Sequence, residues 1–126
     1  MKLSTFSIIW AILYIGFGLG LLLIPVQFMD AYGVSLDDDG TVMARILGAA
    51  LTSFAIVFWL NRNTPATDKS WHNVLLASLI YNIIDIPIVL VATLEGVMNA
   101  LGWMPVGLHL FLAATFGLCL FKRELL

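Results

Sequence analysis

The chain has 126 residues, of which 61% are hydrophobic and 11% are charged, and its formal net charge is −2. Soluble domains carry about 25% charged residues, so this composition excludes an ordinary soluble domain and predicts an integral membrane protein. The acidic balance excludes the basic surface that a nucleic-acid-binding protein needs. The length suits one domain, which we expect to span residues 1–126.

Four long apolar segments follow one another along the chain, at about residues 4–24, 42–60, 72–93 and 103–121. Each is close to the ~20 residues that cross the hydrocarbon core of a bilayer as a helix. The first is too long for the core of a signal peptide, and no small-x-small cleavage site follows it, so we interpret it as an uncleaved spanning helix. The predicted fold is an all-α, integral membrane four-helix bundle.

The loop after the first segment contains Phe28 and Tyr32, which are one helical turn apart beside Met29. This spacing predicts a short amphipathic helix at about residues 26–33, lying in the membrane interface. The acidic run Asp37–Asp39 comes next and lacks the alternating ligand spacing of an EF-hand calcium loop. We expect these carboxylates to cap the positive end of the second spanning helix.

The basic residues that flank the spanning segments fall on one side of the predicted topology: Lys2, Arg62, Lys69, Lys122 and Arg123. The first and third loops, on the other side, contain acidic residues and neither lysine nor arginine. Because cytoplasmic loops are enriched in lysine and arginine, we expect both termini in the cytoplasm.

Small residues recur at four-residue spacing in the first two spanning segments. The first contains Gly16 and Gly20, and the second contains Ala44, Gly48 and Thr52. Small side chains at this spacing let two helices approach closely, which is a main source of helix association in lipid. We expect the two faces to pack against each other within one chain, with oligomerisation as the alternative.

Asp85 is the only acidic residue well inside an apolar segment. A carboxylate in hydrocarbon is costly and needs a partner or a function. The topology places Arg45 of the second segment and His109 of the fourth at a similar depth, in the outer leaflet. Three ionisable side chains from three helices are therefore expected at one level of the bundle.

Other polar residues surround this position. Tyr81, Asn82 and Asp85 lie at positions i, i+1 and i+4 and share one face of the third segment. Pro87 leaves a helix carbonyl without its donor, which favours a hydrated pocket beside Asp85. Near mid-membrane, three residues of the first two segments extend the polar lining: Tyr14, Thr52 and Ser53.

Three roles are open for these groups. Arg45 and Asp85 neutralise each other in a structural network that Asn82 or His109 completes, or the residues line a ligand or substrate pocket, or they form a proton or ion path. The path is the least favoured, because a single acid lies deep in the chain. No local motif predicts a metal, nucleotide or haem site, so we expect no cofactor and no metal ligand.

Two stretches carry a family resemblance: Ala44–Ala50, which contains Arg45-x-x-Gly48, and Gly96–Trp103, which runs on to His109. They resemble the Arg-x-x-Gly-Ala pattern and the last loop and final helix of small uncharacterised four-helix bacterial membrane proteins, DoxX-like in layout. The resemblance covers most of the chain in layout. It implies a multi-pass protein of the bacterial inner membrane and implies no catalytic residues.

The favoured function is non-enzymatic: an accessory or assembly subunit, or a binder of a lipid-like molecule with a polar outer-leaflet site. Its partners would be the lipid bilayer and a homo-oligomer or larger membrane complex. The alternative is a membrane enzyme acting on an apolar substrate, with Asp85 and His109 as a catalytic acid–base pair and Arg45 stabilising charge. A second alternative is a transporter or channel subunit. It would have to be oligomeric, because four helices leave little room for a pore.

Overall fold

The computed structural model describes residues 2–122, which form helices joined by turns and contain no strand. The elements in chain order are α1 (Leu3–Leu23), α2 (Pro25–Ala31), α3 (Asp38–Asn61), α4 (Lys69–Leu94), the 3-10 helix η1 (Ala100–Gly102) and α5 (Trp103–Lys122). Four helical stretches are long and apolar enough to cross a membrane: α1, α3, α4, and η1 together with α5. The predicted all-α architecture with four long apolar helices is therefore confirmed.

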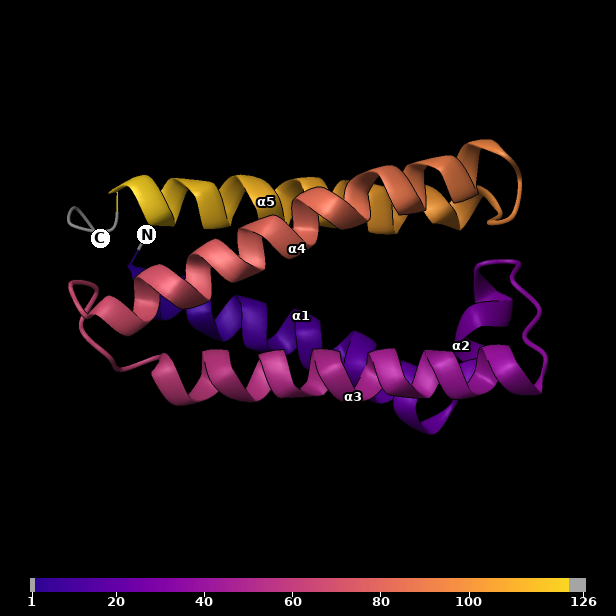
Figure 1. Ribbon diagram of the computed structural model, residues 1–126, viewed down its shortest axis with the longest axis horizontal. Helices are drawn as coiled ribbons and strands as arrows, with labels where there is room; N and C mark the ends of the chain where they lie inside the picture. The colour runs from indigo at the N-terminus through magenta and orange to yellow at the C-terminus, as the bar shows by residue number, and fades with distance from the viewer. Residues whose placement is uncertain (1, 123–126) are drawn as a thin grey trace.

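The helices form two antiparallel pairs that lie one above the other (Figure 1). α1 packs along α3, and α4 packs along α5. The start of α1 and the end of α5 lie at one end of the bundle, whereas α2 and the turn between α4 and α5 lie at the other, which we call the α2 end. We refer below to the α1–α3 pair and the α4–α5 pair.

The α1–α3 pair is held by direct backbone contact at glycine. A Cβ added to Gly48 would lie 2.6 Å from the backbone nitrogen of Leu22 and 2.7 Å from the carbonyl oxygen of Gly18. A Cβ added to Gly18 would lie 2.6 Å from Oγ1 of Thr52. Ala44 is buried on the same face of α3. The small residues predicted on the second spanning segment therefore do face the first segment.

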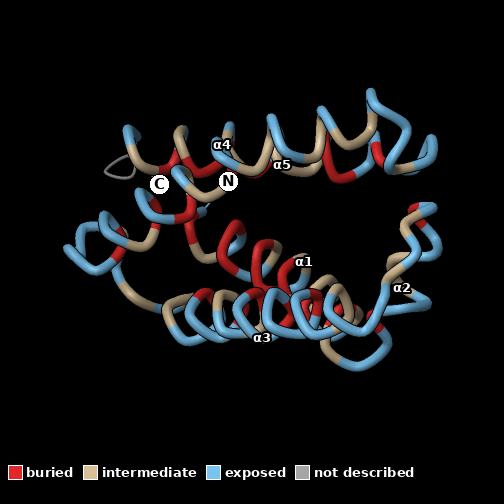
Figure 2. Tube along the Cα trace, turned by 45° about the vertical axis from the view of Figure 1, so that its right-hand side comes forward, coloured by how far each residue is buried: buried red, intermediate tan, exposed pale blue. Residues whose placement is uncertain are grey.

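The face predicted for the first segment was wrong. A Cβ added to Gly16 would have no neighbouring atom within 4 Å, and Gly20 packs against the ring of Phe28 in α2. Gly18 is the glycine of α1 that meets α3. It lies in a row of buried residues that recur about every 3.5 positions: Ser7, Ala11, Tyr14, Gly18 and Leu21. Figure 2 shows this buried stripe along α1. The four-residue glycine spacing was therefore not the packing signal.

Three aromatic rings join the two pairs in the half of the bundle that holds the termini. Trp10, Phe58 and Phe116 are fully buried, and we call them the aromatic cluster. The ring centroid of Trp10 lies 4.4 Å from that of Phe116 and 5.3 Å from that of Phe58. Nε1 of Trp10 donates a hydrogen bond of 3.2 Å to Oγ1 of Thr115, which satisfies the indole.

An aspartate side chain caps the N-terminus of α3, and another caps the N-terminus of α4. Asp37 caps α3 by accepting a hydrogen bond from the backbone nitrogen of Gly40 at 2.7 Å, and α3 begins at Asp38 rather than near residue 42. The acidic cap predicted for this helix is confirmed. Asp68 caps α4 by accepting from the backbone nitrogen of Ser70 at 2.8 Å. That hydrogen bond lowers the pKa of the Asp68 carboxyl, because it favours the charged form.

Asn99 connects the two pairs at the α2 end. Its backbone nitrogen donates to the carbonyl oxygen of Tyr32 at 2.7 Å, and its side-chain Nδ2 donates to the carbonyl oxygen of Ala31 at 3.0 Å. We call these two hydrogen bonds the Asn99 clasp. Gly33 lies against Asn99 with a φ of +79°, a conformation that a residue with a Cβ rarely adopts.

Candidate functional site

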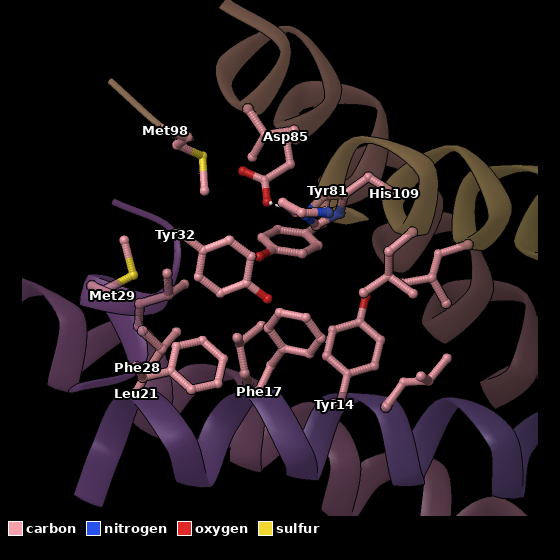
Figure 3. Close-up of a pocket in the computed structure, with 17 residues that line it drawn as sticks. Tyr14, Phe17, Leu21, Phe28, Met29, Tyr32, Tyr81, Asp85, Met98 and His109 are labelled. Carbon is pink, nitrogen blue, oxygen red and sulfur yellow. Dashed lines mark ion pairs between the residues drawn. The ribbon is translucent and has the colours of Figure 1, made fainter. Parts of the chain in front are cut away.

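A partly open pocket of about 160 Å³ lies between the two helix pairs, between the aromatic cluster and the Asn99 clasp. α1, α2, α3, α4 and α5 all contribute to its wall, which is almost entirely apolar. Asp85 and His109 are the exceptions that carry charge or can acquire it. Aromatic side chains form much of the remaining wall (Figure 3): Tyr14, Phe17, Phe28, Tyr32 and Tyr81.

Asp85 and His109 form an ion pair on the pocket wall. Oδ2 of Asp85 lies 3.1 Å from Nε2 of His109. Nδ1 of His109 lies 2.8 Å from Oδ1 of Asn82, and Nδ2 of Asn82 donates both to the Tyr14 hydroxyl at 2.9 Å and to the Ser78 carbonyl oxygen at 2.8 Å. The network therefore links α1, α4 and α5.

The buried amide of Asn82 fixes where the histidine proton lies. The Ser78 carbonyl can only accept a hydrogen bond, so the amide nitrogen of Asn82 must face it and the amide oxygen must face His109. Nδ1 of His109 therefore carries a proton and donates it to Asn82. Nε2 is then the nitrogen that faces Asp85, at 3.1 Å, and a further proton can lie between them.

Arg45 does not join this network. It is exposed on α3 and does not line the pocket. Within residues 2–122 the single ion pair is that of Asp85 with His109, so the expected pairing of Arg45 with Asp85 is not formed. The reason is rotational: Arg45 follows Ala44, which packs toward α1, and each residue turns the helix by about 100°. Depth alone was a poor guide to its neighbours.

Tyr81 is placed by its aromatic neighbours. Its ring lies edge-on to His109, with a centroid distance of 6.1 Å, and it stacks on Phe54 at 5.7 Å. These contacts hold the phenol in the pocket wall beside the ion pair. Thr52 and Ser53 are placed differently from the expectation, because their hydroxyls donate to carbonyls of their own helix, at 2.8 Å and 3.0 Å, and neither lines the pocket.

Tyr32 is a pocket residue that sequence reasoning did not identify as part of the site. It was expected only as an interfacial aromatic, yet its side chain is buried and lines the pocket. A phenol is a neutral hydrogen-bond donor at physiological pH, and burial raises the pKa of Tyr32 further. The one available signal was the spacing of Phe28 and Tyr32, which marks α2 without showing that α2 folds back over the bundle.

The site thus combines an apolar cavity, one acid–histidine pair that can move a proton, and phenol hydroxyls. Within residues 2–122, no three His, Cys, Asp or Glu side chains gather closely enough to hold a metal ion. The residues present are suited to holding an apolar molecule by one polar end. They are also suited to exchanging a proton with it, since Asp85 and His109 face the same cavity.

No protein-family model matches the chain, and neither a curated protein nor a solved structure matches it significantly. The resemblance to DoxX-like proteins therefore stays a prediction.

Proposed function

We propose that this chain is a multi-pass protein of the bacterial inner membrane that binds a lipid-like molecule in the pocket between its helix pairs, in an accessory rather than catalytic role. The pocket supports this proposal, because its wall is apolar except at the Asp85–His109 pair and the tyrosine hydroxyls. Binding sites for small apolar molecules combine such a wall with a few placed polar groups. In the bilayer, lipid is the most abundant molecule that fits this description.

The proposed orientation has both termini in the cytoplasm and the α2 end on the outer side. It rests on the basic residues that flank the helix ends opposite the α2 end: Lys2, Arg62, Lys69 and Lys122. Arg123, the fifth basic residue of the prediction, lies outside the described residues. The α2 end holds Asp30, the Asp37–Asp39 run and Glu95.

Cysteine labelling tests the orientation. We expect Ser35→Cys to react with a membrane-impermeant maleimide in intact spheroplasts, and Asn63→Cys to react only after the membrane is permeabilised. Both positions are exposed, whereas the native Cys119 is fully buried and gives little background. The reverse pattern of labelling would show that the orientation is wrong, and equal labelling of both sites in intact spheroplasts would show that the protein inserts in both orientations.

A pair of matched variants tests ligand binding. Val89 lines the pocket, whereas Val91 on the same helix is 48% exposed. We expect the wild type and Val91→Phe, purified in mild detergent, to retain an enriched apolar molecule in organic extracts analysed by mass spectrometry. Val89→Phe fills part of the cavity and should lower the retained amount by about tenfold, which corresponds to ~1.4 kcal/mol of binding free energy. Equal retention by the two variants would place the molecule outside this pocket.

The enzymatic alternative keeps one supporting observation, which is that Asp85 and His109 meet on the pocket wall with 3.1 Å between Oδ2 and Nε2. The same extracts separate the two functions. A binding protein carrying Asp85→Asn retains the molecule that the wild type retains. An enzyme carrying Asp85→Asn accumulates a chemically different molecule, its unreacted substrate. A transporter has less support, because the aromatic cluster packs the bundle on the other side of the pocket.

A further inference from the structure

We infer that the molecule held in this pocket is an uncharged lipid with a single hydroxyl head group, that is, a long-chain alcohol. The inference rests on the proposed lipid-binding function and adds the chemical class of the ligand. It follows from which charges and hydrogen-bonding groups the pocket offers and from which of them are already engaged.

Anionic lipids find no partner in the pocket. No lysine or arginine lines it, and Arg45 is exposed on another face of α3. The positive form of His109 exists only as the partner of the Asp85 carboxylate. A phosphate or carboxylate head group would therefore be buried beside Asp85 without a counter-charge, and an unpaired charge in an apolar site is strongly unfavourable.

Cationic lipids are disfavoured by the same pair. An amine could be neutralised only by Asp85, which is already bonded to Nε2 of His109. Nδ1 of His109 is committed to Asn82, so the imidazole cannot turn to a new partner. An ammonium group carries three donors, whereas the wall offers the Asp85 oxygen that is not bonded to His109, a few phenols and otherwise apolar atoms, so burying an amine would leave donors without partners.

A hydroxyl matches the groups that remain. The Tyr32 phenol lines the pocket, forms no hydrogen bond within residues 2–122, and is protonated at physiological pH, as phenols ordinarily are. It can donate to a ligand oxygen, and a carboxyl oxygen of Asp85 can accept the ligand's proton. A hydroxyl supplies one donor and acceptor capacity together. Figure 3 shows all three side chains at the cavity, Tyr32 from the end of α2 and both Tyr81 and Asp85 from α4.

A set of probes with one chain and different head groups tests the inference. Delipidated full-length protein in detergent is loaded with deuterated oleyl alcohol and challenged with unlabelled oleyl alcohol, oleic acid, oleylamine or octadecene at mildly alkaline pH, where oleic acid is ionised. Retained deuterated probe is measured by mass spectrometry. We expect the alcohol to displace the label at concentrations about tenfold lower than the acid, the amine or the hydrocarbon require, since each leaves a charge or polar group unpaired.

Two variants complete the experiment. Tyr32→Phe removes only a hydroxyl and should reduce the advantage of the alcohol over octadecene several-fold, with thermal unfolding unchanged. Val89→Phe should reduce retention of every probe. If oleic acid, oleylamine or octadecene competes as well as the alcohol, the inference is overturned while lipid binding stands. If no probe is retained by the wild type, or if Val89→Phe retains all of them, the proposed binding function itself fails.

Discussion

Gly48→Val is expected to destabilise the protein by about 3 kcal/mol or more, the upper range for overpacking a core. The added carbons would meet the backbone of Leu22 and Gly18, at 2.6 Å and 2.7 Å from the position of Cβ. Backbone atoms within a helix cannot move aside as a side-chain end can, so α1 and α3 must separate. Thermal unfolding in detergent, followed by circular dichroism, measures the effect as a large drop in melting temperature.

Gly16→Val is the matched control, because it makes the same change in a neighbouring helix where no atom lies within 4 Å of the added Cβ. Its melting temperature should stay close to that of the wild type. If both variants lose the same stability, the cost comes from the valine itself rather than from the α1–α3 contact. If Gly16→Val alone is damaging, that face of α1 packs against another molecule.

Trp10→Ala is expected to lower the free energy of unfolding by about 3 kcal/mol, the lower end of the range for deleting a buried aromatic side chain. We expect the lower end because an apolar side chain gains little free energy when it moves from lipid into the protein interior. The loss of stability therefore comes from the cavity left behind and from the broken packing contacts. The indole fills the space between α1, α3 and α5 and donates to Thr115. Chemical or thermal unfolding in detergent measures the change.

Trp59→Ala serves as the control for the loss of a tryptophan. Trp59 is 49% exposed and makes one notable contact, with the guanidinium of Arg62 above its ring at 4.1 Å. Such an exposed contact contributes about 1 kcal/mol or less. A loss of stability in Trp59→Ala equal to that in Trp10→Ala would contradict the role assigned to the aromatic cluster in joining the helix pairs.

The spans could be predicted from sequence because hydropathy over about 20 residues is a strong signal. Helix rotation could not, because a nearly uniform apolar segment has no polar face to show which side is buried. The four-residue spacing of Gly16 and Gly20 predicts that their face packs against the second segment, yet the buried face of α1 contains Gly18. The small residues of α3 were a better guide, since Ala44, Gly48 and Thr52 are the ones that approach α1.

The candidate site was likewise predictable in depth but not in helix rotation. Comparison of depths placed Asp85 and His109 at one level, and the structure joins them at 3.1 Å. The same comparison placed Arg45 there as well, although its side of α3 is exposed. The contribution of Tyr32 depends on how α2 folds back over the pocket, which is a tertiary arrangement that no local pattern encodes.

Different interactions join the two helix pairs at the two ends of the bundle. The buried rings of the aromatic cluster pack together near one end, and the two Asn99 hydrogen bonds join the pairs at the other. Asn99 is exposed, so water can replace its hydrogen bonds at little net cost, whereas parting the rings would open an empty cavity. We therefore expect the two pairs to separate more easily at the α2 end than at the aromatic cluster. Hydrogen exchange of the backbone amides around Asn99 should accordingly be faster than that of the helical turns around Trp10.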